Sequence, residues 1–140
     1  NSISYLNLKK IKIILYILIM KKFLKPTINN GRYVFVLIED LDKINQDDIL
    51  CLFKENRKYS LIMKKEDADR YSLSYSFIAA WISLGLNSSL DSVGLTYIIS
   101  KALTQHKISC NVIAGYNHDH IFVNYKDREK AYKILNELKT

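Results

Sequence analysis

The side chains best suited to chemistry in this 140-residue chain are three histidines, two of which flank an aspartate in His118-Asp119-His120. Alternation along a strand would place His118 and His120 on one face and Asp119 on the other. A zinc site needs three or four ligands, and the remaining histidine, His106, follows a predicted helix. We therefore predict no metal site, an Asx-type turn at Asp119, and a structural or ligand-contact role for His118 and His120.

The two cysteines, Cys51 and Cys110, both lie in apolar, strand-like runs. Two cysteines are too few for a disulfide framework, and a buried free thiol is the usual form in such runs. They favour a reducing, cytoplasmic setting. The sequence has no nucleophile–base pair, glycine-rich phosphate loop or paired-cysteine motif, so we predict neither enzymatic activity nor a cofactor.

A turn and a neighbouring strand offer polar groups for a small ligand. The turn Asn87–Leu90 is predicted to end a strand and open a helix, so its backbone N–H groups would be free to hold an anion. Gly94 has no Cβ and would let a ligand or a partner strand approach closely, while Asn111 can donate and accept hydrogen bonds. The alternative for these residues is structural, as helix caps, close packing and a bonded strand end. The candidate ligand-binding residues are Asn87, Ser88, Ser89, Leu90, Val93, Gly94, Asn111, Val112 and Ile113, with His118 and His120 as additional contacts.

The residues around this turn and strand carry a resemblance to a known family. Asn87–Thr96 followed by Ile108–Phe122 resembles an uncharacterised bacterial tandem-ACT family, whose pattern is SSLxAVGLT … IxxNVxAGxxHDHxFV. The resemblance covers about residues 24–138, and its upstream matches are Lys25-Pro26, Gly31–Phe35, Phe53–Glu55 and Trp81–Leu84. The strand 108–114 is also similar to the ACT regulatory strand of aspartate kinases.

This resemblance implies a non-catalytic regulatory domain that binds a small molecule, typically an amino acid, without transforming it. We expect a homo-oligomer (dimer). Two positions depart from the family pattern: Lys58 stands where the family has a glycine in the first hairpin turn, and Asn87 replaces a histidine before Ser-Ser. The alternative function is a structural or protein-interaction ACT module without a ligand.

The second half of the chain has the clearer element pattern. Ser88 and Asp91 form an S-x-x-D capping box that predicts a helix start. Apolar residues then recur at helical spacing at Leu95, Ile98, Ile99, Ala102 and Leu103. Two strands are predicted at 108–114 and 120–125. Asp127 is predicted to cap a final helix whose buried stripe is Ala131, Ile134, Leu135 and Leu138.

In the first half, Arg32–Glu39 is apolar on both faces, which is typical of a central strand. Leu50–Phe53 and Tyr59–Met63 flank a polar turn at Lys54–Lys58 and predict a β-hairpin. Phe77–Leu86 is predicted to be a long strand, which places Ile78, Ala80, Ile82, Leu84 and Leu86 on one face.

These elements predict an α+β, ferredoxin-like (βαββαβ) ACT fold, in which two ACT-like halves share one antiparallel sheet with helices on one face. Halves of about 60 residues would each be marginally stable alone, which favours a shared core. We divide the chain into an N-terminal arm or helix (1–23), a first ACT-like half-domain (24–73) and a second ACT domain (74–140).

The N-terminal arm carries the excess positive charge of the chain. Seven of the 21 lysines and arginines precede residue 33, where there is no acid, so the remaining 14 equal the 14 acidic residues. Because a basic stripe on the folded part is missing, nucleic-acid binding is the less favoured alternative. The apolar run Ile13–Met20 is too short for a membrane span. Either residues 8–24 form an apolar helix packed on the domain, or Met20 is the true start and residues 1–19 are not native structure.

Overall fold

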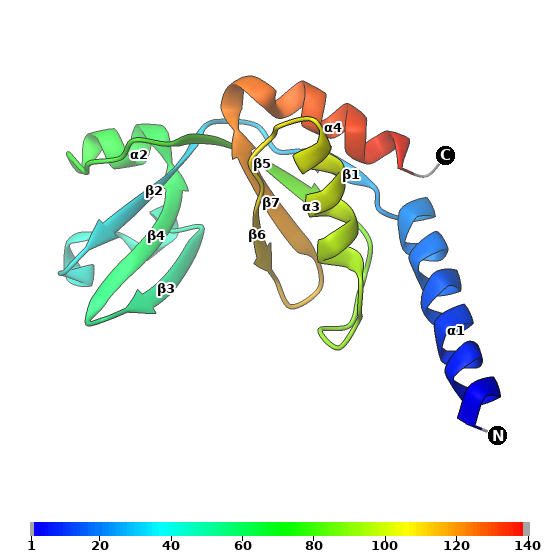
Figure 1. Cartoon of the computed structure of the whole chain (residues 1–140). Helices are drawn as coiled ribbons and strands as arrows, with labels where there is room; N and C mark the ends of the chain where they lie inside the picture. Colours follow the sequence, from blue (N-terminus) through cyan, green and yellow to red (C-terminus); the bar gives the residue numbers. More distant parts are fainter. Residues whose placement is uncertain (1, 139–140) are drawn as a thin grey trace.

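The computed structural model, which describes residues 2–138, contains one antiparallel sheet with three helices on one of its faces (Figure 1). The sheet order is β3-β4-β2-β5-β7-β6, and β1 also pairs with β5. Residue 1 and residues 139–140, the outer ends of two predicted domain ranges, lie outside the described residues. The strands are β1 (Pro26–Ile28), β2 (Tyr33–Ile38), β3 (Cys51–Glu55), β4 (Lys58–Lys64), β5 (Ile78–Leu84), β6 (Asn111–Ala114) and β7 (Asp119–Asn124), and the helices are α1 (Ser2–Lys22), α2 (Lys65–Arg70), α3 (Leu95–Gln105) and α4 (Arg128–Glu137).

Strand β5 belongs to two ferredoxin-like units. In the first unit, β2, β3, β4 and α2 are completed by the start of β5, where Ile78 and Ala79 pair with β2. In the second unit, β5, α3, β6, β7 and α4 are completed by β1, which pairs with the other end of β5 at Ile82–Leu84. The predicted α+β ferredoxin-like fold, with two ACT-like halves in one antiparallel sheet and helices on one face, is confirmed. The division of the chain at residues 73/74 stays a prediction. Strands β1 and β2 precede this point, and both pair with β5, which follows it.

Between β1 and β2 the chain leaves the edge of β5 for a short turn. Asn29 fills this gap, since its backbone N–H donates to the Trp81 carbonyl oxygen at 2.9 Å and its side chain donates to Ser83 Oγ at 2.8 Å. Gly31 has a φ of 104° in this turn, a conformation that favours glycine. Only two residue pairs join β2 to β5, so the contact between the units is narrow at the level of the backbone.

The helix-covered face of the sheet holds two apolar clusters, one in each unit. The strand faces follow the alternation expected from the sequence, because Ala80, Ile82 and Leu84 of β5 are all buried under α3 and α4. Val34 and Val36 of β2 are buried with Ala68 of α2 in the first unit. The predicted stripe of α3 is buried throughout, at Leu95, Ile98, Ile99, Ala102 and Leu103.

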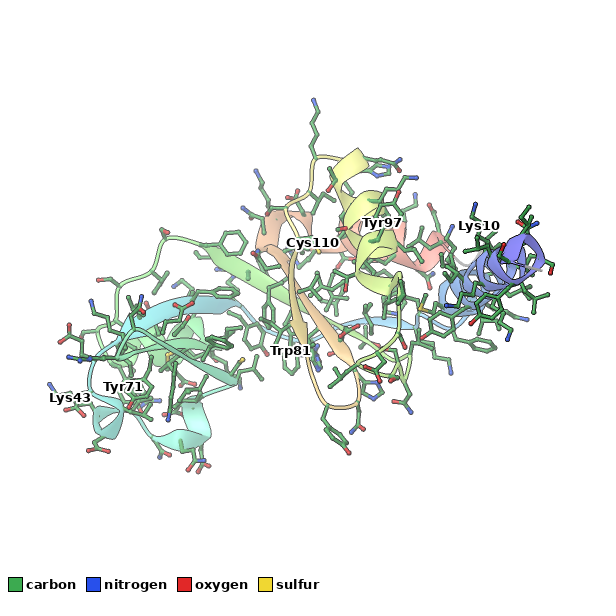
Figure 2. The ribbon with its side chains drawn as sticks, turned by 60° about the horizontal axis from the view of Figure 1, so that its bottom comes forward. Lys10, Lys43, Tyr71, Trp81, Tyr97 and Cys110 are labelled. Carbon is green, nitrogen blue, oxygen red and sulfur yellow. The ribbon has the colours of Figure 1, made fainter. Side chains whose placement is uncertain are left out.

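A third cluster joins the two units on the opposite, helix-free face of the sheet. The Tyr33 ring meets the Trp81 ring edge-on at 5.4 Å, and the Phe35 ring meets the Phe122 ring edge-on at 5.6 Å. Phe122 is only 2% exposed although no helix covers this face. Figure 2 shows Trp81 near the middle of the molecule, with Tyr71 of the first unit to its left and Cys110 of the second unit above it. Aromatic packing therefore widens the narrow backbone contact between the units.

The first hairpin is tighter than predicted. Glu55 pairs with Lys58, which leaves a two-residue turn at Asn56 and Arg57 in place of the predicted five-residue turn. Both residues have positive φ, 45° and 67°, as a type I′ turn requires. Asparagine tolerates this conformation, and the right-handed twist of the flanking strands selects it even with arginine in the second position.

Helix α1 projects from the end of the molecule opposite to the first unit (Figure 1). Its contacts are made by its last turns, where Met20 is 1% exposed and Tyr16 and Ile17 pack against the second unit. Among residues 2–138, none of the helices combines the length and the apolar character that a membrane span needs.

We predict that Phe122→Ala lowers the free energy of unfolding by about 3–5 kcal/mol, because a buried phenylalanine ring is lost and a cavity remains. Phe53 is a matched control, since it is 67% exposed on the neighbouring unit. Phe53→Ala should change the free energy of unfolding by about 0.5 kcal/mol or less. Urea denaturation followed by circular dichroism measures both values, and equal losses would show that Phe122 is not a core residue.

Candidate functional site

The loop between β5 and α3 does not open a helix where the sequence predicted one. Helix α3 begins at Leu95, and its N-cap is Gly94 in the left-handed region with a φ of 112°. The predicted capping box of Ser88 and Asp91 is wrong: the Asp91 N–H donates to Ser89 Oγ, in a local turn. Gly94 is therefore at the helix start rather than one turn inside it, because its positive φ interrupts any helix that would begin earlier.

The start of α3 has no side-chain cap. The first amide with a helical partner is that of Ile98, which donates to the Gly94 carbonyl oxygen at 3.0 Å. The N–H groups in the first turn of α3 therefore have no partner within the helix. Such groups are the donors that bind carboxylates at helix N-termini. Helix α1 lies beside them, since a Cβ added to Gly94 would stand 3.4 Å from Ile17 Cγ1, and the Tyr16 hydroxyl donates to Ser92 Oγ.

The predicted strand residues divide between the two faces of the sheet. Asn111 is opposite Phe122 and Ile113 is opposite His120, so both lie on the helix-free face. Val112 is opposite Ile121 and faces the helices. Asn111 is exposed, and its side chain donates to the Phe122 carbonyl oxygen at 3.3 Å. Within one chain, Asn111 and Ile113 therefore lie on the sheet face away from α3, and only Val112 of the predicted strand residues faces the helices.

The loop residues of the predicted site are largely open to solvent. Leu90 is 73% exposed and Val93 is 66% exposed, while Asn87 and Ser89 are also exposed and Ser88 is half-buried. The loop is tied to the β6–β7 turn by His118, whose Nδ1 lies 3.4 Å from the Leu86 carbonyl oxygen. The loop and the end of β6 are therefore neighbours, even though Asn111 itself points elsewhere.

His120 is the centre of a polar cluster that the sequence did not predict. Its Nδ1 accepts a hydrogen bond from Trp81 Nε1 at 3.0 Å and lies 3.3 Å from Ser83 Oγ. Because an indole N–H can only donate, Nδ1 carries no proton and the neutral ring is protonated at Nε2. The alternation of residues along β5 places its odd-numbered residues on one face. From this pattern the sequence could have predicted that Trp81 and Ser83 lie on the same face.

Burial lowers the pKa of His120, and the neighbouring His118 lowers it further, while Asp119 opposes the shift. Burial also raises the pKa of Asp119, which His120 partly offsets. Asp119 is the first residue of β7 and pairs with Ala114. The turn before it depends on Gly115, because a Cβ there would stand 2.6 Å from the His118 carbonyl oxygen.

The remaining reactive groups show no catalytic arrangement in the described part of the chain. Both cysteines are free and half-buried, and burial raises the pKa of Cys110 to about 11, which disfavours a thiolate. Over residues 2–138, no three or more His, Cys, Asp or Glu side chains lie close enough together to hold a metal ion.

Two ACT-domain family models match the chain, one over residues 19–80 and one over residues 77–137. They overlap at the start of β5, the strand that both units share. A protein of unknown function from Vibrio cholerae, described as a possible transport protein, is 31% identical, with a TM-score of 0.83 over 91% of this chain and 99% of that one. The chain belongs to this tandem ACT-domain family. The resemblance to an uncharacterised tandem-ACT group is thereby confirmed.

More distant structures share the fold of this tandem ACT protein. A protein from Agrobacterium tumefaciens is 16% identical, with a TM-score of 0.64 over 83% of this chain and 89% of that one. The ligand-free regulatory subunit of aspartate kinase from Thermus thermophilus is 7% identical, with a TM-score of 0.60 over 85% of this chain and all of that one. No curated protein matches the sequence.

We predict that His120 titrates below the usual histidine pKa of about 6.5. Since the unfolded state then binds the proton more tightly, the stability contributed by neutral His120 is complete above about pH 6.5 and is lost as the pH falls towards the folded pKa. Trp81→Phe removes a donor to the neutral ring and should move the pKa back towards 6.5. Proton NMR of the His120 ring measures both values, and a wild-type midpoint of about 6.5 or higher would refute the assignment.

Proposed function

We propose that this tandem ACT protein is a regulatory module that binds an amino acid at the β5–α3 loop and signals through association of copies of the chain. The observation that carries the proposal is the uncapped start of α3 at Gly94, in a unit whose outer strand β6 has an open edge. The α-carboxylate of an amino acid would bind the first-turn N–H groups of α3, as anions do at helix N-termini. The site residues proposed are Asn87–Leu90, Val93 and Gly94 of the loop.

The strand part of the proposed site calls for a second copy. Asn111, Val112 and Ile113 lie on the outer strand of the second unit, and an open strand edge invites pairing with another chain. If two β6 edges pair in a homodimer, each copy brings its outer strand, with Asn111, Val112 and Ile113, to the second unit of the partner. The side-chain oxygen Oδ1 of Asn111 would then accept from the ammonium group of the ligand. His118 is held against the loop at Leu86 and is proposed as a contact, with His120 beside it.

The solved structures with the same fold support a regulatory role for this protein. The Thermus thermophilus relative is the regulatory subunit of an aspartate kinase, and it shares with this chain the fold that such a role uses. The two free cysteines fit the reducing, cytoplasmic location that we propose with the function. No step of the proposal requires catalysis or a cofactor.

The alternative is an ACT module that pairs with itself or with another protein and has no ligand. It is favoured by the second open edge of the sheet, β3, which lies at the opposite end of the strand order from β6. Such a module would associate with the same strength whether or not amino acids are present.

We predict that at least one of the twenty amino acids, at about 10 mM, raises the melting temperature of the full chain. A ligand present at 100 times its dissociation constant stabilises a protein by about 2.7 kcal/mol. Asn111→Ala should reduce the shift, whereas Asn136→Ala in α4, on the helix side, should leave it unchanged. Sedimentation at several concentrations with and without the ligand measures the association.

Two outcomes separate the alternatives. No shift with any amino acid, together with concentration-dependent association, would favour the interaction module. A ligand shift in a chain that stays monomeric at all concentrations would refute the role of the second copy.

A further inference from the structure

A cavity of about 330 Å³ lies where residues of the two units meet. Arg32, which precedes β2, contributes from the first unit, and Asn124–Lys126, which follow β7, contribute from the second. The segment Ser76–Ile78, which leads into β5, forms another part of the wall. The cavity adjoins the narrow contact, where Val34 pairs with Ile78.

The charged side chains of this cavity are all cationic. Arg32 and Lys126 line it, and none of its lining residues is acidic. The Arg32 guanidinium stacks over the Tyr125 ring at 4.7 Å, and the Arg128 guanidinium lies over the same ring at 4.0 Å. Two guanidinium groups thus lie over one aromatic ring, and Lys126 lines the same cavity as that ring.

These cations have no counter-ion in the described part of the chain. The ion pairs among residues 2–138 involve Lys58, Lys65 and Arg70 as cations, and none involves Arg32, Lys126 or Arg128. Asp127 and Glu129 are adjacent in sequence to Lys126 and Arg128, and neither acid forms an ion pair within residues 2–138. Bringing like charges together is unfavourable, and a bound anion removes that cost.

The contact with the Tyr125 ring also positions the charge of Arg32 beside the cavity. The planar fork of N–H donors of a guanidinium can bind two oxygens of a carboxylate or phosphate side by side. Arg128 Nη1 donates to the Tyr125 carbonyl oxygen at 2.9 Å, so that its charge is held in place as well. Phe77 and Ile78 supply an apolar wall, which suits a ligand with a small apolar part.

We propose that this cavity binds a small organic anion through a carboxylate or phosphate group, held by Arg32 and Lys126. The site goes beyond the proposed function, because it uses neither the β5–α3 loop nor the edge of β6. Its occupant connects Arg32 of the first unit with Lys126 of the second, and therefore stiffens the contact that β2 and β5 make through two residue pairs. The small volume and the balanced charge of residues 33–140 favour a small anion over a nucleic acid.

The test is a titration of the full chain with inorganic phosphate and, separately, with benzoate, at constant ionic strength with chloride as the reference. Binding is measured by amide NMR shifts. We expect saturable binding of at least one probe, with shifts centred on Arg32, Ser76–Ile78 and Tyr125, and the stronger probe identifies the anionic group. Hydrogen bonds to charged groups contribute enough that Arg32→Gln and Lys126→Gln should each weaken binding about tenfold.

The matched control is Arg57→Gln, which removes the same charge from an exposed turn of the first unit. It should change the affinity by about twofold or less, because exposed, distant charges are screened. Arg32→Lys keeps the charge but loses the planar fork, so its affinity should fall between those of the wild type and Arg32→Gln.

The proposal is wrong if neither probe binds saturably, or if Arg57→Gln weakens binding as much as Arg32→Gln does. If Arg32→Gln fails to fold, the affinity of Lys126→Gln decides the test. Lys126 is exposed, so its substitution should not affect folding. Asn111→Ala should leave phosphate and benzoate binding unchanged. The two proposals are therefore tested separately. Anion binding in the cavity can be observed when no amino acid binds at the β5–α3 loop, and amino-acid binding can be observed when no anion binds in the cavity.

Discussion

The pairing of β5 with strands of both units is the constraint on which the rest of this structure depends. A single seven-residue strand supplies the last strand of the first unit and the first strand of the second. Neither unit can keep its sheet if β5 is removed. A unit of about 60 residues buries so little surface that it would be only marginally stable alone. Because the two units share a strand, they can also share part of a core. The aromatic cluster of Tyr33, Trp81 and Phe122 is the part of that core which neither unit forms by itself.

The same constraint sets where the two proposed sites lie in the molecule. Backbone pairing between the units is limited to Tyr33 with Ala79 and Val34 with Ile78. The aromatic cluster adjoins this contact, and so does the cationic cavity around Arg32 and Tyr125. A change in the angle between the units must alter one of these two. The β5–α3 loop begins one residue after the other end of β5, so events at the loop and at the cavity act on opposite ends of one strand.

The sequence predicted the local patterns of this fold well, because they depend on residues close together in the chain. The faces of β5 and the buried stripe of α3 follow from periodicities of two and 3.6, and the structure confirms them. The pairing of β1 with the far end of β5 could not be predicted in this way, since Pro26 and Leu84 are joined by register and not by any repeat in the sequence. The capping box failed for a related reason. The pattern Ser88-x-x-Asp91 allows a helix start, but Gly94 has a backbone conformation that moves the start to Leu95.

The candidate site was predicted less well than the fold, and the reason is physical. Gly94 and Asn111 both belong to the family pattern. Strand alternation turns the Asn111 side chain to the helix-free face, whereas the loop that contains Gly94 leads to the helix side. A sequence pattern shows which residues occur together and does not show which face each one occupies. In the proposed function, a single copy therefore holds two incomplete halves of a site. The ammonium nitrogen and the carboxylate carbon of an amino acid are only about 2.5 Å apart, so the proposal calls for a second chain to bring its own strand to the ligand. Ligand binding and association would then be coupled to each other.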